Sequence, residues 1–433
     1  MATRTIQLGI DYGTSASKMI FWDELAAGKP KAYAIDGGSG FRFPSSVACV
    51  GENLVFGQSP QMSGLPSDAV WYESIKMRVA AECSPDHKRF CYGSIPKPPE
   101  GMTFTDLSVL TIWQLRSLAT YYIGRRLSAA KSEFGLSVTV GIPRSFYESA
   151  SLRCQFLKIT RAAEILHKQG QFTEQSLSLK TAKDAIRFAK VVLAADGIDD
   201  RFWLRSEAEA DMFWPVRCPG VPPGPYAQVD IGAGTTNAAV VSIWERNSSR
   251  RWIKDSLGFY GAQSVDTGTD AIDASLAKIL GIPAEQCLSL RGHERNHVNK
   301  MGIGKLLPVF WNIREAYDLA WRRSTACLNQ AERQTFPDHM VFVTGGGSLI
   351  PGLAEELCRE PSRPHFQRRV RQLERPDDLY SLDDKPVSHE DMPFLSAAYG
   401  LSFHPDEVPP TYQSAKEPLL RRRYIGLGVI YDK

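Results

Sequence analysis

Residues 8–18 read Leu-Gly-Ile-Asp-Tyr-Gly-Thr-Ser-Ala-Ser-Lys and lead into the apolar run Met-Ile-Phe-Trp at 19–22. Residues 228–237 show the same pattern of residue types, Gln-Val-Asp-Ile-Gly-Ala-Gly-Thr-Thr-Asn, and lead into the apolar run 238–241. Each stretch holds an apolar strand, an Asp, a small turn rich in Gly, Thr and Ser, and a second apolar strand. This pattern predicts two β-hairpins that lie far apart in the chain.

The two turns have the composition of a phosphate-binding surface. Glycine lets backbone N–H groups face a ligand without a Cβ in the way, and hydroxyl groups add donors. Asp11 and Asp230 stand beside the turns and suit a hydrated Mg²⁺, which prefers oxygen ligands. A unit of this kind present twice suggests two halves that close on one nucleotide from opposite sides. The alternative is that both Asp residues are plain turn residues, a position that favours Asp anyway.

The composition indicates a well-buried globular protein with two or more domains. The chain has 433 residues, 43% of them hydrophobic, and a net charge of +3. A net charge this small argues neither for nor against a nucleic-acid partner. The basic stretches 367–371 and 421–423 are interpreted as solvated surface, so nucleic acid is not an expected partner.

The cysteines and the N-terminus indicate a reducing compartment. The 8 Cys residues are scattered without a C-x-x-C pair, which favours free thiols over a zinc ribbon or a redox motif. The chain enters a predicted strand almost at once and shows no signal-peptide core. No apolar run is long enough to predict a transmembrane helix. We therefore expect a cytoplasmic protein with no membrane partner.

Apolar periodicity predicts strands and helices in alternation along both halves. The expected strands cover 6–11, 18–22, 43–50 with 54–56, 138–143, 202–204 and 340–343. The expected helices cover 105–133, 149–168, 173–194, 206–214, 265–280, 306–332 and 397–400, and 361–391 is expected to be rich in loops. The pattern predicts an α/β fold with two similar lobes.

In these features the chain resembles the actin, Hsp70 and sugar-kinase superfamily of ATPases. That superfamily uses two Asp-bearing phosphate hairpins and a third, Gly-rich adenosine loop. Residues 341–351 read Val-Phe-Val-Thr-Gly-Gly-Gly-Ser-Leu-Ile-Pro, so all three segments are present in the superfamily's order. The resemblance implies an α/β fold with two similar lobes of the actin-like (ribonuclease H-like) kind. It also implies a central nucleotide cleft for ATP or ADP with Mg²⁺.

Within the superfamily the chain is most similar to the Hsp70 nucleotide-binding domain. Residues 73–77 (Glu-Ser-Ile-Lys-Met) resemble the stretch that carries that family's catalytic lysine. Residues 205–210 (Arg-Ser-Glu-Ala-Glu-Ala) resemble its Asn-Glu-Pro-Thr-Ala-Ala segment, with Ala where the usual Pro follows the Glu. Residues 140–146 resemble its Val-Pro-Ala strand end, and residues 397–400 resemble its hinge helix.

The resemblance assigns roles to particular residues. Asp11 and Asp230 would hold Mg²⁺ through its waters, and Lys76 and Glu207 would act on the γ-phosphate and on the attacking water, together with Asp230 and Thr235. The alternatives are a solvated helix-face lysine for Lys76 and an ordinary helix N-terminal acid for Glu207. The residues implied to contact the nucleotide are Asp11, Gly13, Thr14, Ser15, Lys18, Gly232, Ala233, Gly234, Thr235, Thr236, Gly268, Asp270, Asp318, Arg322, Gly345, Gly346, Gly347 and Ser348.

The adenosine side departs from the Hsp70 pattern. Gly345, Gly346 and Gly347 suit close backbone approach to the ribose, but Leu349 stands where Hsp70 proteins carry an adenine-stacking Arg. Trp321 likewise falls where a Lys is usual in the helix that lines the adenine pocket. These departures bear on base preference more than on phosphate binding.

The expected domain organisation follows the same resemblance. Lobe I covers 1–205 with an inserted subdomain at about 40–115, and lobe II covers 206–390 with an inserted subdomain at about 275–335. A hinge helix at 391–403 is expected to return to lobe I, and 404–433 forms a Pro-rich linker and tail. About 30 residues follow Gly400, too few for the peptide-binding domain of Hsp70 proteins.

We therefore expect a slow Mg-dependent ATPase that acts as a nucleotide-driven switch in a chaperone-type or regulatory role. It would work with a separate protein partner or client, and an oligomer is compatible with the sequence. The alternatives are an actin-like filament-forming ATPase and a small-molecule kinase of the same fold. A further motif, His-Glu-Arg-Asn-His at 293–297, matches the H-E-x-x-H pattern of zinc proteases, but its polar surroundings favour a solvated surface segment.

Overall fold

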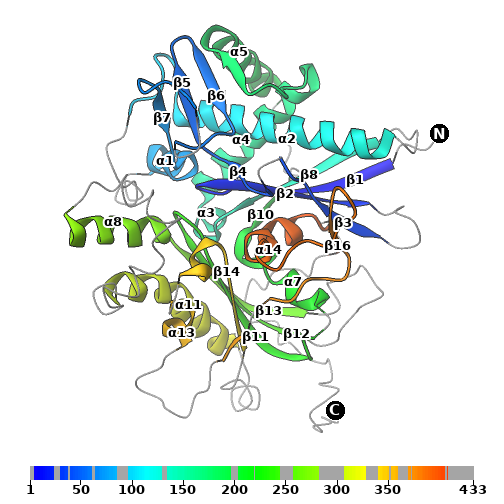
Figure 1. Ribbon diagram of the computed structural model, residues 1–433, viewed down its shortest axis with the longest axis vertical. Coiled ribbons are helices and arrows are strands. Elements are labelled where there is room, and N and C mark those ends of the chain that lie inside the picture. The colour runs from blue at the N-terminus through cyan, green and yellow to red at the C-terminus, as the bar shows by residue number, and fades with distance from the viewer. Residues whose placement is uncertain are drawn as a thin grey trace. The chain divides into compact units, whose positions relative to one another are not determined.

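The chain forms a mixed α/β structure, which a computed structural model describes for most of its length (Figure 1). Two compact units are present, each with its own core. Unit 1 comprises 1–142, 146–205 and 380–385, and unit 2 comprises 143–145, 206–379 and 386–433. The described residues are 4–23, 30–37, 40–60, 64–84, 96–128, 134–196, 203–218, 220–243, 257–281, 307–327, 340–350, 353–358, 369–371, 373–404 and 407.

A mixed sheet forms the centre of unit 1. Its strand order is β10-β8-β1-β2-β3-β16, and β4 pairs with β2 off this path. The first hairpin is present as expected, because β1 pairs antiparallel with β2 while β8 lies parallel to β1 on its other side. The strands are β1 (Arg4–Asp11), β2 (Ala16–Asp23), β3 (Lys31–Ala34), β4 (Phe43–Pro44), β8 (Phe134–Ile142), β10 (Trp203–Ser206) and β16 (Leu379–Ser381).

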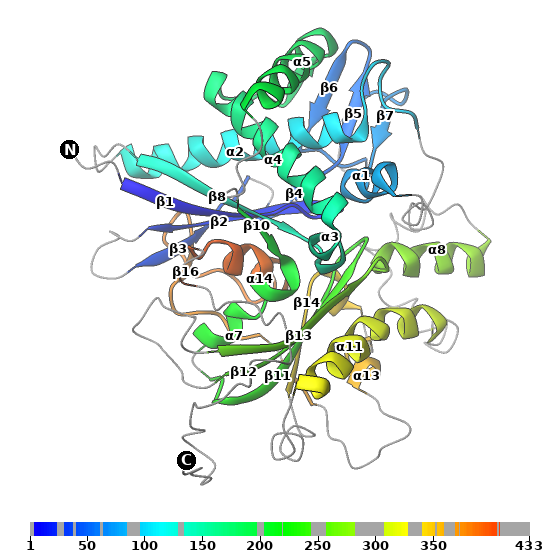
Figure 2. The same cartoon turned by 180° about the vertical axis from the view of Figure 1, so that it is seen from behind.

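Helices bury one face of this sheet. The helices of unit 1 are α1 (Ile75–Cys83), α2 (Phe104–Ser128), α4 (Ala150–Gln169) and α5 (Leu179–Asp196), and the short helix α3 (Arg144–Glu148) begins in unit 2 and ends in unit 1. Helices α2 and α4 lie side by side along the sheet, as Figures 1 and 2 show. Apolar side chains of β1, α2 and α4, among them Leu8, Leu110 and Ile159, form one continuous core because each element turns its apolar face to the others.

A second, smaller sheet lies within the range in which we expected an inserted subdomain of lobe I. It has the order β7-β5-β6-β9, with β5 (Val47–Val50), β6 (Asn53–Phe56), β7 (Val70–Tyr72) and β9 (Ser176–Ser178). The hairpin predicted around Glu52 and Asn53 is confirmed by the antiparallel pairing of β5 with β6. Strand β9 also belongs to this sheet through its pairing with β6, although it lies outside the range of about 40–115 expected for the subdomain.

A five-stranded sheet forms the centre of unit 2. Its order is β13-β12-β11-β14-β15, and the second hairpin is confirmed by the antiparallel pairing of β11 with β12. Every residue of β12 is buried, as expected of a strand covered on both faces. The strands are β11 (Gly224–Ile231), β12 (Thr236–Ile243), β13 (Leu257–Val265), β14 (Met340–Thr344) and β15 (Arg369–Arg371).

Helices cover both faces of this second sheet. Helix α11 packs on β12 and β13 and shares a core with α8 and α13, whereas α6, α7 and α14 pack together (Figure 1). Aromatic side chains of α7 and α14 pack together, with Trp214 of α7 meeting Tyr399 of α14 edge-on. The helices are α6 (Glu207–Ala210), α7 (Phe213–Arg217), α8 (Thr269–Leu280), α11 (Leu307–Cys327), α13 (Leu353–Cys358) and α14 (Met392–Leu401).

The two central sheets repeat one strand order. In each, a three-stranded antiparallel meander (β1-β2-β3 or β11-β12-β13) is extended by a strand parallel to its first member, β8 or β14. The Asp at the end of the first strand faces the same register position in both hairpins, Lys18 opposite Asp11 and Asn237 opposite Asp230. The two turns therefore have equal length.

Several sequence predictions differ from the structure. The helix expected over 173–194 begins only at Leu179, since 176–178 form strand β9. The helix expected over 206–214 is two short helices, α6 and α7, and the strand β13 was not predicted at all. Two short strands, β15 and β16, occur within the loop-rich range 361–391.

The expected hinge helix does not return to the first unit. Residues 386–404 belong to unit 2, where α14 packs on α6 and α7. Buried contacts explain this placement, because Ser396 donates a hydrogen bond to Asp211 at 2.6 Å and Tyr399 packs against Trp214. The segment that does return is Tyr380–Lys385. It is held by Arg126, which forms an ion pair with Asp384 and stacks over the Tyr33 ring.

Replacement of Gly400 tests the close packing of α14. A Cβ at this position would lie 1.8 Å from the carbonyl oxygen of Ala210, so Gly400→Ala must push α14 away from α6. We expect the free energy of unfolding to fall by about 1–3 kcal/mol, as for other overpacked cores. Gly124→Ala is the matched control within α2, where the nearest atom lies 4.0 Å away.

The control is expected to gain about 0.5–1 kcal/mol from the better helix propensity of alanine. Chemical denaturation of both variants measures the difference. Equal stabilities of the two variants would contradict the helix contact.

Candidate functional site

The predicted site residues fall into two groups, one in each compact unit. In unit 1, Asp11 ends β1 and is buried, at 6% exposure. Lys18 lies opposite on β2 and forms an ion pair with it, with 2.7 Å between Nζ and Oδ2. Charge-assisted hydrogen bonds of this length are strong where water is excluded. The hairpin thus holds a carboxylate and an ammonium at the start of its turn.

Gly13 is required by the shape of this turn. A Cβ on Gly13 would lie 2.0 Å from the carbonyl oxygen of Ala16 and 3.3 Å from Lys18 Nζ. Because the Ala16 oxygen is a backbone atom, a larger residue at position 13 could be accommodated only by a movement of the backbone. The Gly13 N–H donates to the Asp11 carbonyl at 3.0 Å, which fixes the start of the turn.

The hydroxyl groups of the first turn differ in exposure. Thr14 is buried and Ser15 is exposed, so Ser15 is the residue of the pair that meets solvent. Ser17 is fully buried and shares a 2.8 Å hydrogen bond with Ser45, whose N–H also donates to the Ser15 carbonyl. The segment around Ser45 therefore supports the turn from outside the hairpin.

Lys76 is buried in the first turn of α1, at 3% exposure. The alternative of a solvated helix-face lysine is therefore wrong. Ser74, the residue before the helix, adopts a left-handed conformation with φ 53° and ψ 35°. Such a conformation is costly for a residue with a Cβ and is common at functional sites. The strained turn sets the point at which the lysine-bearing helix begins.

In unit 2, Asp230 lies near the end of β11 and is half-buried. Thr344 at the end of the parallel strand β14 lies close by, its Oγ1 3.4 Å from Asp230 Oδ1. Gly345 follows with φ 75°, a conformation that favours glycine. A Cβ there would lie 2.4 Å from Asp230 Oδ1, so the backbone of the 345–348 loop is packed directly on the carboxylate.

This contact changes the interpretation of the glycine run 345–347. We expected these glycines to allow close approach of a ribose. In the structure Gly345 and Gly347 pack on β11, since a Cβ on Gly347 would lie 2.3 Å from Ile231 Cγ2, and the approach of a ribose stays a prediction. Gly346 alone is exposed, and Ser348 donates its hydroxyl to the Gly345 carbonyl at 2.7 Å within the same turn.

The second hairpin turn is bonded to the start of α8. The N–H groups of Thr269 and Asp270 donate to the carbonyls of Gly232 and Ala233, each at 2.9 Å. Gly268 permits this contact because a Cβ on it would lie 2.4 Å from the Ala233 oxygen. The predicted residues of the turn 232–236 and of the 268–270 loop are thereby brought together.

The two threonines of this turn are buried. The Thr236 hydroxyl donates a hydrogen bond to the Thr267 carbonyl at 2.7 Å, so its proton already has an acceptor within the protein. Thr235 is 3% exposed, and its carbonyl accepts the Gly232 N–H at 2.9 Å. Gly234 is also buried, which leaves Gly232 and Ala233 as the more accessible residues of the turn.

Glu207 belongs to a buried polar network beside the hairpin. It is 3% exposed, and its Oε2 accepts a 3.0 Å hydrogen bond from Asn237 Nδ2. Arg144, which follows the β8 strand end, reaches Asn237 through its backbone N–H at 3.5 Å and forms an ion pair with Glu209. Ser145 adds a 3.3 Å hydrogen bond from its hydroxyl to Asp266. A buried carboxylate needs such partners because desolvation is costly.

Asn237, Arg144 and Asp266 were not assigned roles from the sequence. Asn237 could have been found by matching the two hairpins on their Asp residues, because it occupies the position of Lys18. Arg144 and Asp266 carry no such local signal. Their contacts join segments that are distant in the chain, so only the folded structure reveals them.

The residues expected around the adenine have structural contacts. Asp318 forms an ion pair with Arg314 one turn away on α11, at 3.3 Å. Trp321 packs against the core of unit 2, and Arg322 is exposed. Leu349 is half-buried at the end of the 345–348 loop.

Some predictions lie outside the described residues. Among these are the H-E-x-x-H segment 293–297, much of the subdomain expected at about 275–335, the basic trio 421–423 and most of the tail 404–433. In the part of the chain that is described, no group of three or more His, Cys, Asp or Glu side chains is arranged to bind a metal directly. Over the same residues, none of the helices combines the length and apolarity needed to span a membrane.

The sequence comparisons add no relative. No protein-family model matches the chain, and no curated protein is significantly similar to it.

The strain at Ser74 can be tested at the two ends of α1. Ser74→Gly removes the Cβ from a left-handed residue, and we expect the free energy of unfolding to rise by up to about 1 kcal/mol. Ser84, at the other end of the helix, is extended with φ −145°. Ser84→Gly should therefore lower stability by about 0.5–1 kcal/mol through the entropy of the unfolded chain.

Thermal and urea unfolding of both variants provide the measurement. A loss of stability in Ser74→Gly equal to that in the Ser84 control would show that residue 74 carries no strain.

Proposed function

We propose that the chain is a nucleotide-binding protein of the actin, Hsp70 and sugar-kinase superfamily, and that it hydrolyses ATP slowly with Mg²⁺. One observation carries the proposal: an Asp-bearing hairpin occupies the same position in two sheets of the same strand order. A duplicated hairpin of this kind supports the two-lobed, actin-like arrangement in which both halves contact one nucleotide. The shared strand order and register add to the hairpin motifs that suggested the superfamily, because the motifs alone do not fix how the other strands pair.

The residues of both turns fit a phosphate chain with a metal. Gly13 and Gly232 have no side chain to cover the turn, and a Cβ on either would lie close to a backbone oxygen. Backbone N–H groups can therefore line a ligand surface. Asp11 and Asp230 supply hard oxygen donors suited to the waters of Mg²⁺. When bound, Mg²⁺ would neutralise phosphate charge.

Two lysines have roles in this proposal. Lys18 is paired with Asp11 across the hairpin and can exchange that partner for a phosphate oxygen, which would free the carboxylate for the metal waters. Lys76, buried in the first turn of α1, would place its ammonium on the γ-phosphate. Glu207, oriented by Asn237, would accept a hydrogen bond from the attacking water.

Two structural observations favour the Hsp70-like role over the alternatives. Lys76 is buried rather than solvated, and Glu207 is held by a hydrogen bond in a buried network. Both residues belong to the segments that resemble Hsp70 proteins. We therefore propose a cytoplasmic, nucleotide-driven switch with a chaperone-type or regulatory role, which acts on a separate partner or client.

The paired carboxylates provide the first test. We expect Asp11→Asn and Asp230→Asn each to lower Mg-dependent ATP turnover by a factor on the order of 10²–10³, because each removes charge from the metal site. Asp184→Asn is the matched control, since Asp184 is exposed on α5. Turnover is measured without any acceptor, and thermal unfolding checks that each variant is folded.

Retention of full turnover in either carboxylate variant would exclude the site. Sedimentation of the wild-type protein with ATP, ADP and no nucleotide separates the alternatives. Nucleotide-dependent pelleting would support a filament-forming ATPase instead. Turnover seen only with an added acceptor would support a kinase.

Lys76 provides a test of binding against turnover. Lys76→Met keeps the apolar stem and removes the ammonium, so we expect nearly unchanged nucleotide affinity with a loss of turnover on the order of 10²-fold. Lys180→Met on the exposed side of α5 is the control. Affinity is measured by calorimetric titration with ATP and ADP. A normal rate in Lys76→Met would remove this lysine from the site.

A further inference from the structure

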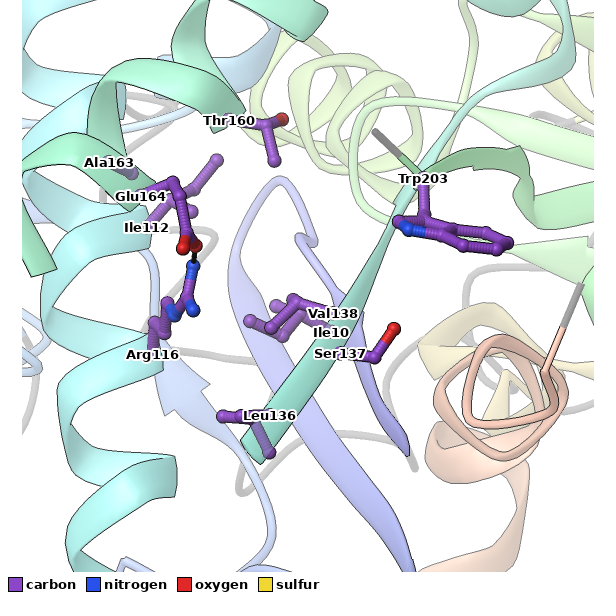
Figure 3. A pocket seen from close by; sticks show the side chains of 10 residues that line it. All are labelled: Ile10, Ile112, Arg116, Leu136, Ser137, Val138, Thr160, Ala163, Glu164 and Trp203. Carbon is purple, nitrogen blue, oxygen red and sulfur yellow. Dashed lines mark ion pairs between the residues drawn. The ribbon is translucent and has the colours of Figure 1, made fainter. Parts of the chain in front are cut away.

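Unit 1 contains a cavity of about 220 Å³ between its sheet and two of its helices (Figure 3). The sheet contributes residues of β1, β8 and β10, and helices α2 and α4 form the other wall. The lining residues are Ile10, Ile112, Arg116, Leu136, Ser137, Val138, Thr160, Ala163, Glu164 and Trp203. None of these residues has a part in the proposed ATPase site.

One end of the cavity is charged. Arg116 of α2 and Glu164 of α4 form an ion pair there and are 9% and 7% exposed (Figure 3). The described residues provide no acceptor for the buried Nε–H of Arg116. A guanidinium has five N–H donors, and Glu164 uses only part of them. A buried donor without a partner is costly, so this edge of Arg116 calls for an acceptor.

The charge balance at this end is positive. Glu164 is approached by two cations, Arg116 and Lys168, the latter with 3.7 Å between Nζ and Oε1. Burial and the charge of Arg116 lower the pKa of the neighbouring His167 to about 4, so His167 is neutral at pH 7. Burial lowers the pKa of Arg116 only to about 10, and its guanidinium remains charged at pH 7.

The rest of the cavity is mainly apolar. Ile10 and Val138 line its middle, Ile112 lies beside the ion pair, and the Trp203 ring lies on the side away from the ion pair (Figure 3). An apolar cavity of about 150 Å³ is known to hold benzene, so this one can hold a ring with a short substituent. Water is poorly suited to the apolar part, because a buried water needs two to four polar partners.

We propose that this cavity binds a small aromatic carboxylate. The ring would pack among the apolar side chains, and the carboxylate would accept from the unpartnered Nε–H of Arg116. The guanidinium is charged, so a hydrogen bond from this N–H to a carboxylate is stronger than one to a neutral acceptor. Occupation of the cavity requires no nucleotide, so nucleotide-free protein tests this binding independently of the proposed ATPase.

Three probes separate the contributions of charge and ring. Phenylacetate carries both, phenylacetamide is its neutral counterpart, and acetate lacks the ring. In ligand-observed NMR titrations of the full chain, we expect saturable binding of phenylacetate and at least tenfold weaker binding of phenylacetamide. Acetate should show no saturable binding. Absence of saturable phenylacetate binding, or equal affinities for the acid and the amide, would overturn the proposal.

Two variants locate the binding. Ala163→Leu fills the cavity from α4 and should weaken phenylacetate binding at least tenfold. The double variant Arg116→Gln with Glu164→Gln replaces the ion pair by two amides and should remove the preference for the acid over the amide. The double change avoids an unpaired buried charge.

Arg125→Gln is the matched control on α2, because Arg125 is exposed and does not line the cavity. It should leave the phenylacetate affinity unchanged. Thermal unfolding confirms that each variant is folded. Unaltered phenylacetate binding in folded Ala163→Leu, or an equal loss in Arg125→Gln, would show that the acid binds elsewhere.

Discussion

Close packing of glycine main chain on the end of β11 and the turn after it is the constraint on which unit 2 depends. Gly268, Gly345 and Gly347 come from two other segments, and a Cβ on any of them would lie 2.4 Å or less from atoms of residues 230–233. Only glycine permits such contact without a backbone shift. The loop after β14 and the first turn of α8 are therefore packed closely against the end of β11 and the second hairpin turn.

Buried carboxylates impose a second constraint on the same unit. Glu207 and Glu209 lie in a helix of four residues, which is too short to hold them by itself. Asn237 and Arg144, from two other segments, supply the compensating hydrogen bond and charge. Removal of one partner of a buried charged pair typically costs about 3–5 kcal/mol. The polar network is thus part of the fold as well as a candidate site, and it fixes the orientation of both carboxylates.

Local patterns were predicted well, and patterns that depend on packing were not. Both hairpins and the long helices α2, α4 and α11 follow from apolar spacing and turn composition. Strand β13 was missed because two glycines interrupt its apolar residues and its first four residues are all buried, so its sequence shows no clear alternation. The break between α6 and α7 was missed because it depends on how α14 packs against both. The glycine run 345–347 was recognised, but its contacts with β11 were not.

The sequence alone determined the two Asp-bearing hairpins, since the residues that form each turn are neighbours in the chain. It also determined the mixed α/β class through the spacing of apolar residues. Only the tertiary structure decided that both sheets share one strand order, that Lys76 is buried, and that α14 belongs to unit 2. Those outcomes depend on contacts between residues separated by long stretches of chain, and such contacts leave no periodic trace in the sequence.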